Sequence, residues 1–553
     1  MEMLSGAEMV VQSLVDQGVK QVFGYPGGAV LNIYDELYKA QDRITHIITA
    51  HEQGAAHAAD GYARASGKTG VVLATSGPGA TNLVTGIANA YLDSVPMVAI
   101  TGNVSVSALG KDSFQEVDIV GVTEPVVKHS FMVRDVTELE KIIKEAFYIA
   151  NSGRKGPVLI DIPKNVQTGE CEYGNAVLPD EVIRPKPQYS LTEVIRLIKE
   201  SRKPFIYCGG GVLSAGAEKE LLQFSRQIEA PVGLSMMGRT ALPDSYELNL
   251  GMCGMHGNFA SSKAQSECDL MLAIGVRFSD RATGDLSEYT KKCTVVHIDI
   301  DKAELGKNVN ADISVRGDIR DVLPDLMKQL PELKHKEWVQ EVMEYKKVDN
   351  PPRDDAFTPR NIIEAVRRKT KDDTVVATDV GQHQMWTIQY YKFEKPHTLL
   401  TSGGFGTMGY GLGAAIGGCI ARGRKRTVLF TSDGSFGMNL NELCTVVTQK
   451  LPITIVVLDN EVLGMVRQWQ TIFYGARYSQ TTLNRKTKFA AVADAFGAKG
   501  YSVSSLLELE RVLTETDTGD EGAYVIDCHI DKDEKVYPMI PPGHSIKDII
   551  LKG

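Results

Sequence analysis

Nine strand-length apolar runs, each ending in small or polar residues, constrain the fold of this 553-residue chain more than any other feature. Their apolar residues are consecutive rather than alternating, which indicates strands covered on both faces. Segments with helical spacing separate the runs, so the sequence predicts an α/β fold of parallel sheets flanked by helices. The runs are VVLATSG (71–77), PMVAITGN (96–103), PVLIDIP (157–163), PFIYCGGG (204–211), LMLAIGV (270–276), VVHIDID (295–301), TVVATDVG (374–381), TVLFTSDG (427–434) and ITIVVLDN (453–460).

Two charged, proline-containing stretches interrupt this pattern, at residues 178–190 and 346–359. Such composition is typical of interdomain linkers. We therefore predict three doubly wound parallel-sheet domains, at residues 1–180, 190–345 and 360–553.

Charge and composition exclude several classes of protein. The net charge of -9 and the pI of about 5.8 argue against a nucleic-acid-binding protein, which would normally carry an excess of basic residues. Eight scattered cysteines without metal-type spacing are typical of reduced thiols in a reducing compartment. The N-terminus resembles a capped helix starting near Ser5 rather than a signal peptide. The uncharged stretch 401–421 contains eight glycines, so no membrane span is predicted and a cytoplasmic protein is expected.

The stretch from Thr431 to Gly464 pairs two of the runs, which end at Asp433 and Asn460. A helical segment lies between them, so the unit is strand, helix, strand, and a crossover of this length makes the strands parallel. Their carboxyl ends then meet at one edge of the sheet, where two oxygen ligands suit Mg²⁺. Gly434 and Ser435 begin the helix and offer N–H groups to phosphates. A helix cap at Asp433 and a turn at Asn460 would leave the same pattern, and the spacing does not separate the two interpretations.

The sequence SDGSFGMNLNEL…LDNEVLGMVRQW, residues 432–469, resembles the diphosphate-binding motif of thiamine diphosphate (ThDP) enzymes. Its last part resembles the acetolactate synthase (acetohydroxyacid synthase) catalytic subunits. The resemblance implies that Asp433, Asn460 and the backbone oxygen of Val462 hold magnesium. Ser432 and Asp459 depart from the usual glycine and asparagine, but neither stands at a ligand position.

Other segments extend the resemblance along the whole chain. HEQGA places the catalytic glutamate at Glu52, although a glutamate near a helix start is usually only a favourable N-terminal charge. The remaining residues that the resemblance assigns to ThDP are Pro26, Gln382, His383, Gly406, Gly434, Ser435 and Met408, which would hold the cofactor bent.

The resemblance also implies a substrate site. Gln115 would bind reacting oxygens, and Arg281 would bind the carboxylate of a second 2-ketoacid through its planar guanidinium. Ser279 departs from the usual aspartate beside Arg281. The other implied substrate residues are Gly28, Ala29, Phe114, Lys128, Met465 and Trp469.

The predicted middle domain, residues 190–345, contains segments that resemble the FAD-binding segments of the same family. The glycine-rich stretch 207–217 is by itself a weak dinucleotide fingerprint, because Ser214 takes the place of the third glycine. The contacts that the resemblance implies are Arg154, His256, Arg277, Asp299 and Asp318. Because carboligation involves no net redox change, the flavin would be structural.

The resemblance implies ThDP-dependent decarboxylation of pyruvate and ligation to pyruvate or 2-ketobutyrate, in valine, leucine and isoleucine synthesis. It also implies a homodimer or dimer of dimers with sites between subunits, a separate small regulatory subunit, and a mobile lid formed by residues 536–553. Three alternative functions are compatible with parts of the resemblance: a pyruvate oxidase, a glyoxylate carboligase, which lacks the glutamate present here as Glu52, and a flavin-holding scaffold without catalysis.

Overall fold

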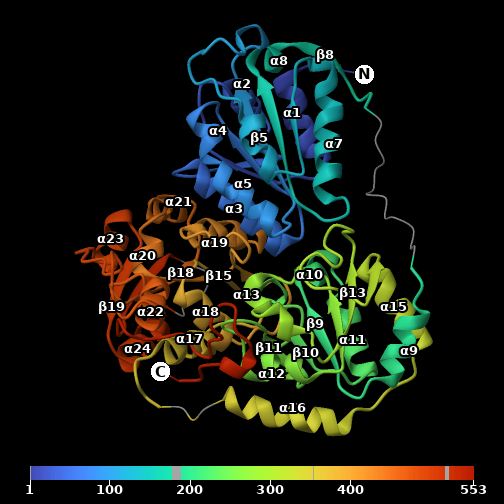
Figure 1. Ribbon diagram of the computed structural model, residues 1–553. Coiled ribbons are helices and arrows are strands. Elements are labelled where there is room, and N and C mark those ends of the chain that lie inside the picture. Colours follow the sequence, from blue (N-terminus) through green and yellow to red (C-terminus); the bar gives the residue numbers. More distant parts are fainter. Residues whose placement is uncertain (1, 177–188, 351, 353, 517–521, 553) are drawn as a thin grey trace.

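The computed structural model describes residues 2–176, 189–350, 352, 354–516 and 522–552 (Figure 1). Each third of the chain forms one six-stranded parallel sheet, and a two-stranded antiparallel sheet joins β1 to β8. The predicted α/β class is therefore confirmed, and all nine apolar runs contain strands. Most of the first predicted linker, 178–190, lies outside the described residues.

The first sheet has the strand order β3-β2-β4-β5-β7-β6. Ser5 caps α1 through a capping box with Glu8, which confirms the predicted helix start. The strands are β1 Glu2–Ser5, β2 Gln21–Gly24, β3 Thr45–Ile48, β4 Gly70–Ala74, β5 Met97–Asn103, β6 His129–Met132, β7 Pro157–Pro163 and β8 Glu170–Tyr173. The helices are α1 Gly6–Asp16, α2 Leu31–Lys39, α3 Glu52–Ser66, α4 Pro78–Asn82, α5 Val84–Leu92, α6 Ile119–Thr123, α7 Leu139–Asn151 and α8 Lys164–Thr168.

The second sheet has the order β11-β10-β9-β12-β13-β14. Its last helix, α16, includes residues 346–348, so the second predicted linker starts later than expected. The strands are β9 Pro204–Cys208, β10 Val232–Leu234, β11 Asn249–Met252, β12 Leu270–Ile274, β13 Thr294–Asp299 and β14 Ile313–Arg316. The helices are α9 Thr192–Glu200, α10 Gly210–Ala215, α11 Glu218–Gln227, α12 Phe259–Glu267, α13 Asp280–Thr283, α14 Leu286–Tyr289, α15 Ile319–Gln329 and α16 Lys336–Val348.

The third sheet has the order β16-β15-β17-β18-β20-β19. Strands β17 and β18 are parallel neighbours, with Thr431 opposite Val457, so the predicted crossover unit is confirmed. The strands are β15 Val375–Thr378, β16 Leu399–Leu400, β17 Thr427–Thr431, β18 Ile453–Asp459, β19 Lys499–Val503 and β20 Tyr524–His529. The helices are α17 Pro359–Arg368, α18 Gln382–Tyr390, α19 Tyr410–Ala421, α20 Asp433–Phe436, α21 Leu443–Thr448, α22 Gly464–Phe473, α23 Phe489–Phe496 and α24 Leu506–Thr516.

The first and third domains share one hydrophobic core, in which α3 lies against α19 (Figure 1). Small residues allow this close approach: a Cβ added at Gly417 would lie 1.9 Å from the Ala58 backbone oxygen. The second part of the glycine-rich stretch 401–421 thus forms α19, a helix of 12 residues that packs against α3. Within the described ranges, no helix is both long and apolar enough to cross a bilayer.

Gly417→Ala is expected to destabilise the protein, although alanine normally favours a helix interior over glycine by about 0.5–1 kcal/mol. The added methyl group would meet backbone atoms of Ala58 and Tyr62, which cannot rotate away. Overpacking of this kind costs about 1–3 kcal/mol or more. Scanning calorimetry would show a lower Tm. Gly28→Ala, where a Cβ meets only open space, is the control; equal Tm values for the two variants would contradict the packing argument.

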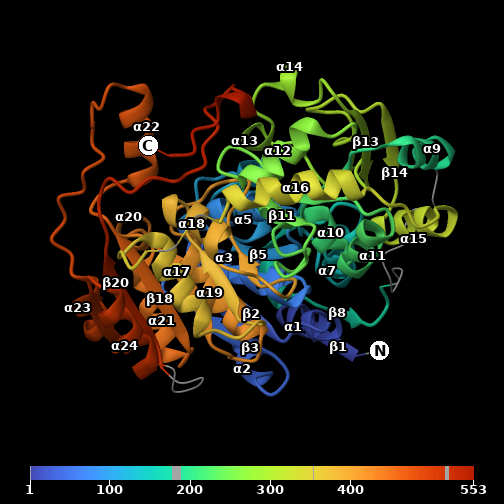
Figure 2. The same cartoon turned by 90° about the horizontal axis from the view of Figure 1, so that it is seen from below.

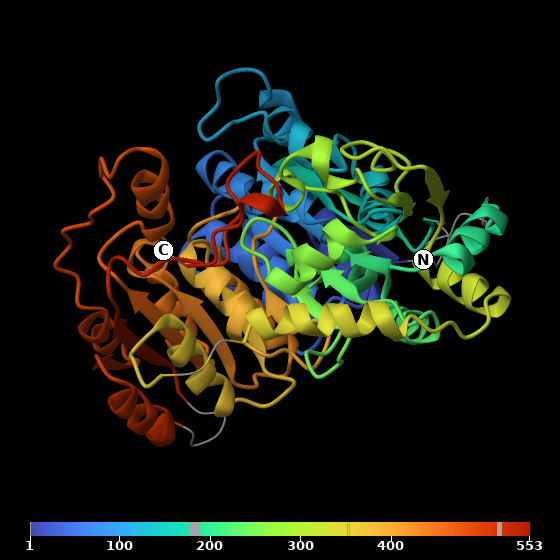
Figure 3. The same cartoon turned by 60° about the horizontal axis from the view of Figure 1, so that its bottom comes forward.

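The C-terminal residues 530–552 form no long regular element and pass from the third domain, where Gln468 Nε2 donates to the Val536 oxygen at 3.1 Å, to the middle domain (Figures 2 and 3). The Ile540 backbone N–H donates to the Met255 oxygen at 2.8 Å. Farther along, Lys547 Nζ lies 2.7 Å from Glu288 Oε2. The segment that was expected to be a lid is therefore tied to the middle domain at more than one point.

Candidate active site

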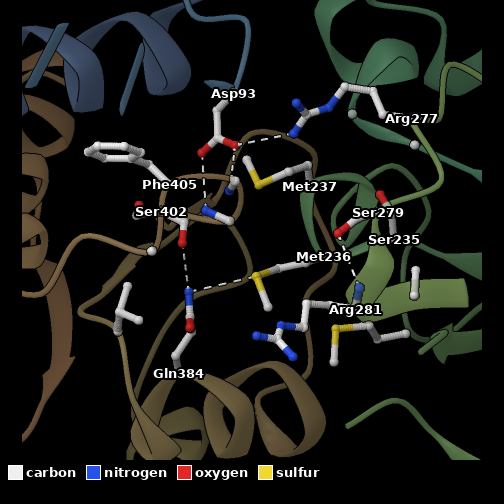
Figure 4. Close-up of a pocket in the computed structure, with 18 of the residues that line it drawn as sticks. Asp93, Ser235, Met236, Met237, Arg277, Ser279, Arg281, Gln384, Ser402 and Phe405 are labelled. Atoms are coloured by element: carbon white, nitrogen blue, oxygen red, sulfur yellow. Dashed lines mark hydrogen bonds and ion pairs between the residues drawn. The ribbon is translucent and has the colours of Figure 1, made fainter. Parts of the chain in front are cut away.

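A cavity of about 840 Å³ lies where the three domains meet, with most of its lining from the middle and third domains. Its size is within the usual range for cofactor and ligand pockets. Figure 4 shows Ser402, Phe405 and Gln384 on one side, Arg277 on the other, and Met236 between them. The predicted residues that line it are Arg154, His256, Arg277, Arg281, Asp299, Asp318, Gln382, His383, Gly406, Met408, Asn460, Val462, Met465 and Trp469.

All five residues assigned to FAD line this one cavity. Asp299 ends β13 and accepts the Asp301 backbone N–H, while burial raises the pKa of Asp299 to about 6. Asp318 caps α15 and pairs with Arg320 at 2.6 Å. Burial lowers the pKa of His256 to about 4, so its imidazole is neutral. Basic and acidic side chains thus line one cavity at the carboxyl ends of the middle strands, which is where open α/β sheets bind ligands.

The third domain supplies the other wall. Gln382 and His383 open α18 directly after β15, and Asn460 follows β18. Gln382 Oε1 accepts from Asn460 Nδ2 at 3.4 Å. A Cβ at Gly464 would lie 1.9 Å from that same oxygen, so a side chain at this position would displace the Gln382 amide. Burial lowers the pKa of His383 to about 3 and keeps its ring neutral.

Asp433 occupies the first position of α20, capped by Ser432. Burial, and then the nearby charge of Asp459, raise the pKa of Asp433 to about 7. Its Oδ1 is buried and has no hydrogen-bond partner within the described residues. A buried carboxylate oxygen without a donor is what a bound divalent cation would satisfy.

Asp433 does not itself line the cavity, and neither do Gly434 and Ser435, which follow the lining residue Ser432. Four buried polar atoms that do line it also have no hydrogen-bond partner among the described residues. They are His383 Nε2, His256 Nδ1, Glu304 Oε2 and Trp469 Nε1. Because buried polar groups are normally hydrogen-bonded, these atoms indicate a pocket shaped for polar ligands. The residues present therefore fit ThDP, a metal ion and a nucleotide.

Glu52 does not line this cavity. It begins α3 and accepts the Asn82 side-chain amide at 3.0 Å, with Gly79 beside it. Gln115 has a φ of 60°, and a Cβ at Gly77 would lie 2.8 Å from its backbone oxygen. Glu52 and Gln115 thus both contact the glycine loop after β4, forming a group of predicted residues separate from the third-domain wall.

The loop after β2 carries three further predicted residues. Its Ala29 backbone N–H donates to Thr75 Oγ1 at 3.1 Å, which anchors the loop to the end of β4. Pro26 is half-buried and Gly28 is exposed in the same loop. The loop therefore belongs to the Glu52 side of the molecule.

Two more predicted substrate residues, Phe114 and Lys128, lie apart from the cavity, as Gly28 and Ala29 do. Phe114 is 87% exposed. Lys128 Nζ donates to the backbone oxygens of Ile149 and Ser152 at the end of α7, and burial lowers the pKa of Lys128 to about 8. Arg281, by contrast, places its guanidinium carbon 5.4 Å from the centre of the Trp469 ring.

The departures from the motif have local roles. Ser432 caps α20 and Ser279 caps the helix that carries Arg281. Asp459 turns toward His529, with 3.9 Å between Oδ2 and Nδ1, rather than toward the cavity. Ser432 and Ser279 also line the cavity, so these two departures change its lining while leaving Arg281 and Asn460 in place.

Sequence reasoning missed a buried polar network that supports the 402–408 loop. Asp93, labelled in Figure 4, accepts the backbone N–H groups of Gly403 and Gly404 at 3.1 and 2.8 Å. It also pairs with Arg64 at 2.9 Å. Ser402 Oγ donates to Asn89 Oδ1 at 2.5 Å. No local pattern marks these residues, because their partners lie more than 300 positions away in the chain.

Comparisons with known proteins agree with this architecture. Models of the N-terminal TPP binding domain, central domain and C-terminal TPP binding domain of thiamine pyrophosphate enzymes match residues 4–122, 191–326 and 379–528. The chain is 43% identical, over 99% of its length and 95% of the relative, to the probable acetolactate synthase large subunit of Methanocaldococcus jannaschii. The chain belongs to the acetolactate synthase large-subunit family.

Two Escherichia coli relatives support the assignment. The acetolactate synthase isozyme 3 large subunit is 43% identical over 100% of this chain and 99% of the relative. The isozyme 2 large subunit is also 43% identical, over 99% of this chain and its own full length. The family predicted from residues 432–469 is thus confirmed, and the first and third sheets correspond to its two thiamine diphosphate-binding domains.

Proposed function

We propose that this acetolactate synthase family member decarboxylates pyruvate and joins the remaining two-carbon unit to a second 2-ketoacid. The products would be 2-acetolactate, from pyruvate, or 2-aceto-2-hydroxybutyrate, from 2-ketobutyrate. Both are precursors of branched-chain amino acids. The arrangement that supports this is the presence of two complementary half-sites, one around Glu52 and one around Asp433.

The half-sites suggest a homodimer, or a dimer of dimers, as the active form. Glu52 does not line the cavity of its own chain, so the Glu52 side of one copy would complete the cavity of another. Because a two-fold interface is self-complementary, one pairing would complete both sites.

Asp433, Asn460 and the backbone oxygen of Val462 would hold Mg²⁺, which leaves positions for diphosphate oxygens. When bound, ThDP supplies a carbon nucleophile at C2 of its thiazolium ring. Glu52 would hold a proton at the pyrimidine ring, and Met408 would fill the bend of the cofactor. With the cofactor and a partner copy in place, the cavity would exclude water from the reacting atoms, which protects reactive carbon centres from protonation.

Arg281 and Trp469 would receive the acceptor ketoacid. The guanidinium pairs with a carboxylate through a planar fork, and the indole ring provides an apolar wall for the alkyl group. FAD, bound by Arg154, Arg277 and their neighbours, would have a structural role, since the ligation involves no net electron transfer.

We also propose that a small regulatory subunit joins this chain, because the relatives are named large subunits. A cytoplasmic location is consistent with all eight cysteines being free thiols.

One assay tests the proposal. The chain is incubated with pyruvate, ThDP, Mg²⁺ and FAD, and the products are acidified, which converts acetolactate to acetoin. We expect acetoin after acidification and no peroxide or dye reduction. Peroxide in step with pyruvate loss would instead indicate an oxidase that uses the flavin for electron transfer. Mixing pyruvate with 2-ketobutyrate would then give the acceptor preference.

A further inference from the structure

Glu442 lies in the third domain but binds the backbone that leads into the Glu52 helix of the first domain. It ends the short 3-10 helix Leu440–Glu442 and is fully buried. Its carboxylate accepts the backbone N–H of Ala50, at 3.0 and 3.2 Å, and that of His51 at 3.0 Å. Thr445 Oγ1 donates to the same carboxylate at 2.6 Å.

The Glu442 carboxylate lies against the backbone of α3 at a position where no side chain is present. A Cβ at Gly54, two residues into α3, would lie 2.1 Å from Glu442 Oε1. The helix therefore carries a glycine at the point where the carboxylate enters. The carboxylate is paired with N–H and O–H donors rather than with a cation in the described residues, and burial raises the pKa of Glu442.

The segment that Glu442 holds is the one that positions Glu52. His51 caps α3 by accepting the Gln53 backbone N–H at 3.1 Å, and Thr49 Oγ1 donates to the His51 oxygen at 3.0 Å. Glu52 is the next residue, so a shift of the 50–51 backbone moves its carboxyl group directly. Reacting groups tolerate little displacement, because about 1 Å can cost on the order of 100-fold in rate.

We propose that Glu442 is a positioning residue for Glu52, acting through the Ala50 and His51 backbone amides. The inference rests on the proposed catalytic role of Glu52. A purely structural carboxylate would change stability alone, whereas a positioning carboxylate changes the proton chemistry that Glu52 directs.

Glu442→Gln tests this, because glutamine keeps the volume but has one acceptor oxygen where two are used. We expect hydrogen–deuterium exchange at C2 of bound ThDP, measured without pyruvate, to slow by about 10- to 100-fold. The affinity for ThDP should change far less. In the protein without cofactor, the amide hydrogens of Ala50 and His51 should lose protection from exchange.

The matched control is Glu140→Gln. Glu140, near the start of α7, is also a buried carboxylate that accepts backbone N–H groups, those of Gly174 and Asn175, and it pairs with Lys144 at 2.7 Å. None of these partners is a predicted site residue. We expect the C2 exchange rate to be unchanged in this variant, even if Tm falls.

Thr445→Val gives a milder second test should Glu442→Gln fail to fold. It removes only the hydroxyl that fixes the carboxylate, and C2 exchange should slow several-fold. Unchanged C2 exchange in whichever of these variants folds would overturn the inference. If Glu52→Gln itself leaves C2 exchange intact, the proposed role of Glu52 fails; if only Glu442→Gln does, the positioning role alone is wrong.

Discussion

Glu52→Gln is expected to lower kcat for acetolactate formation by about 100- to 10,000-fold, the range over which a positioned acid or base accelerates a reaction. Glutamine can still accept the Asn82 amide and keeps the side-chain volume, so the fold should survive. It cannot hold the exchangeable proton that the pyrimidine ring requires. A coupled acetoin assay at saturating pyruvate would measure the change.

The control for this substitution is Glu170→Gln, an exposed carboxylate on β8 of the same domain. It should retain normal kcat and Tm. A Glu52→Gln enzyme with kcat within about twofold of the parent would contradict the assignment of Glu52, since a loss of even 1.4 kcal/mol in transition-state stabilisation would appear as about tenfold.

Asp433→Asn is expected to weaken the joint binding of Mg²⁺ and ThDP by about 100-fold or more. Mutation of residues that only support the metal ligands already lowers metal affinity by about 10- to 100-fold, and Asp433 is proposed as a ligand itself. The carboxylate has a buried oxygen without a donor within the described residues. A neutral amide avoids the cost of burying that charge. The variant without cofactor should therefore be as stable as the parent or more so, while calorimetric titration shows the lost affinity.

Asp459→Asn is the matched control, since it alters the neighbouring carboxylate on β18, which turns to His529 instead. It should bind Mg²⁺ and ThDP normally. Equal losses in both variants would indicate a general electrostatic effect and would remove Asp433 from the metal site.

Mixing the two inactive variants tests the interfacial site. If Glu52 of one copy serves the cavity of another, each hybrid dimer carries one intact site and one doubly altered site. Random exchange would then restore about a quarter of the parent activity. Activity that stays at the level of the separate variants would show that both residues serve a site within one chain.

The nine strands that coincide with apolar runs, and the helix start near Ser5, could be predicted from the sequence because each depends on neighbouring residues in the chain. Continuous apolar runs mark buried parallel strands wherever they occur, and Ser5 with Glu8 marks a helix start. The spacing of Asp433 and Asn460 predicted a strand–helix–strand crossover with parallel strands, because that prediction depends only on the length and helical pattern of the segment between them. The resemblance added residue roles that spacing alone left open.

The sequence by itself determined the α/β class, the positions of nine interior strands and the family of this chain. Only the tertiary structure decided which distant residues meet. Glu442 lies 392 positions from Ala50, and Asp93 lies 310 positions from Gly403. The physical reason is that packing of α3 against α19 brings these polar groups together. The first and third domains share one hydrophobic core, and a contact between residues so far apart in the chain leaves no pattern in the sequence around either residue.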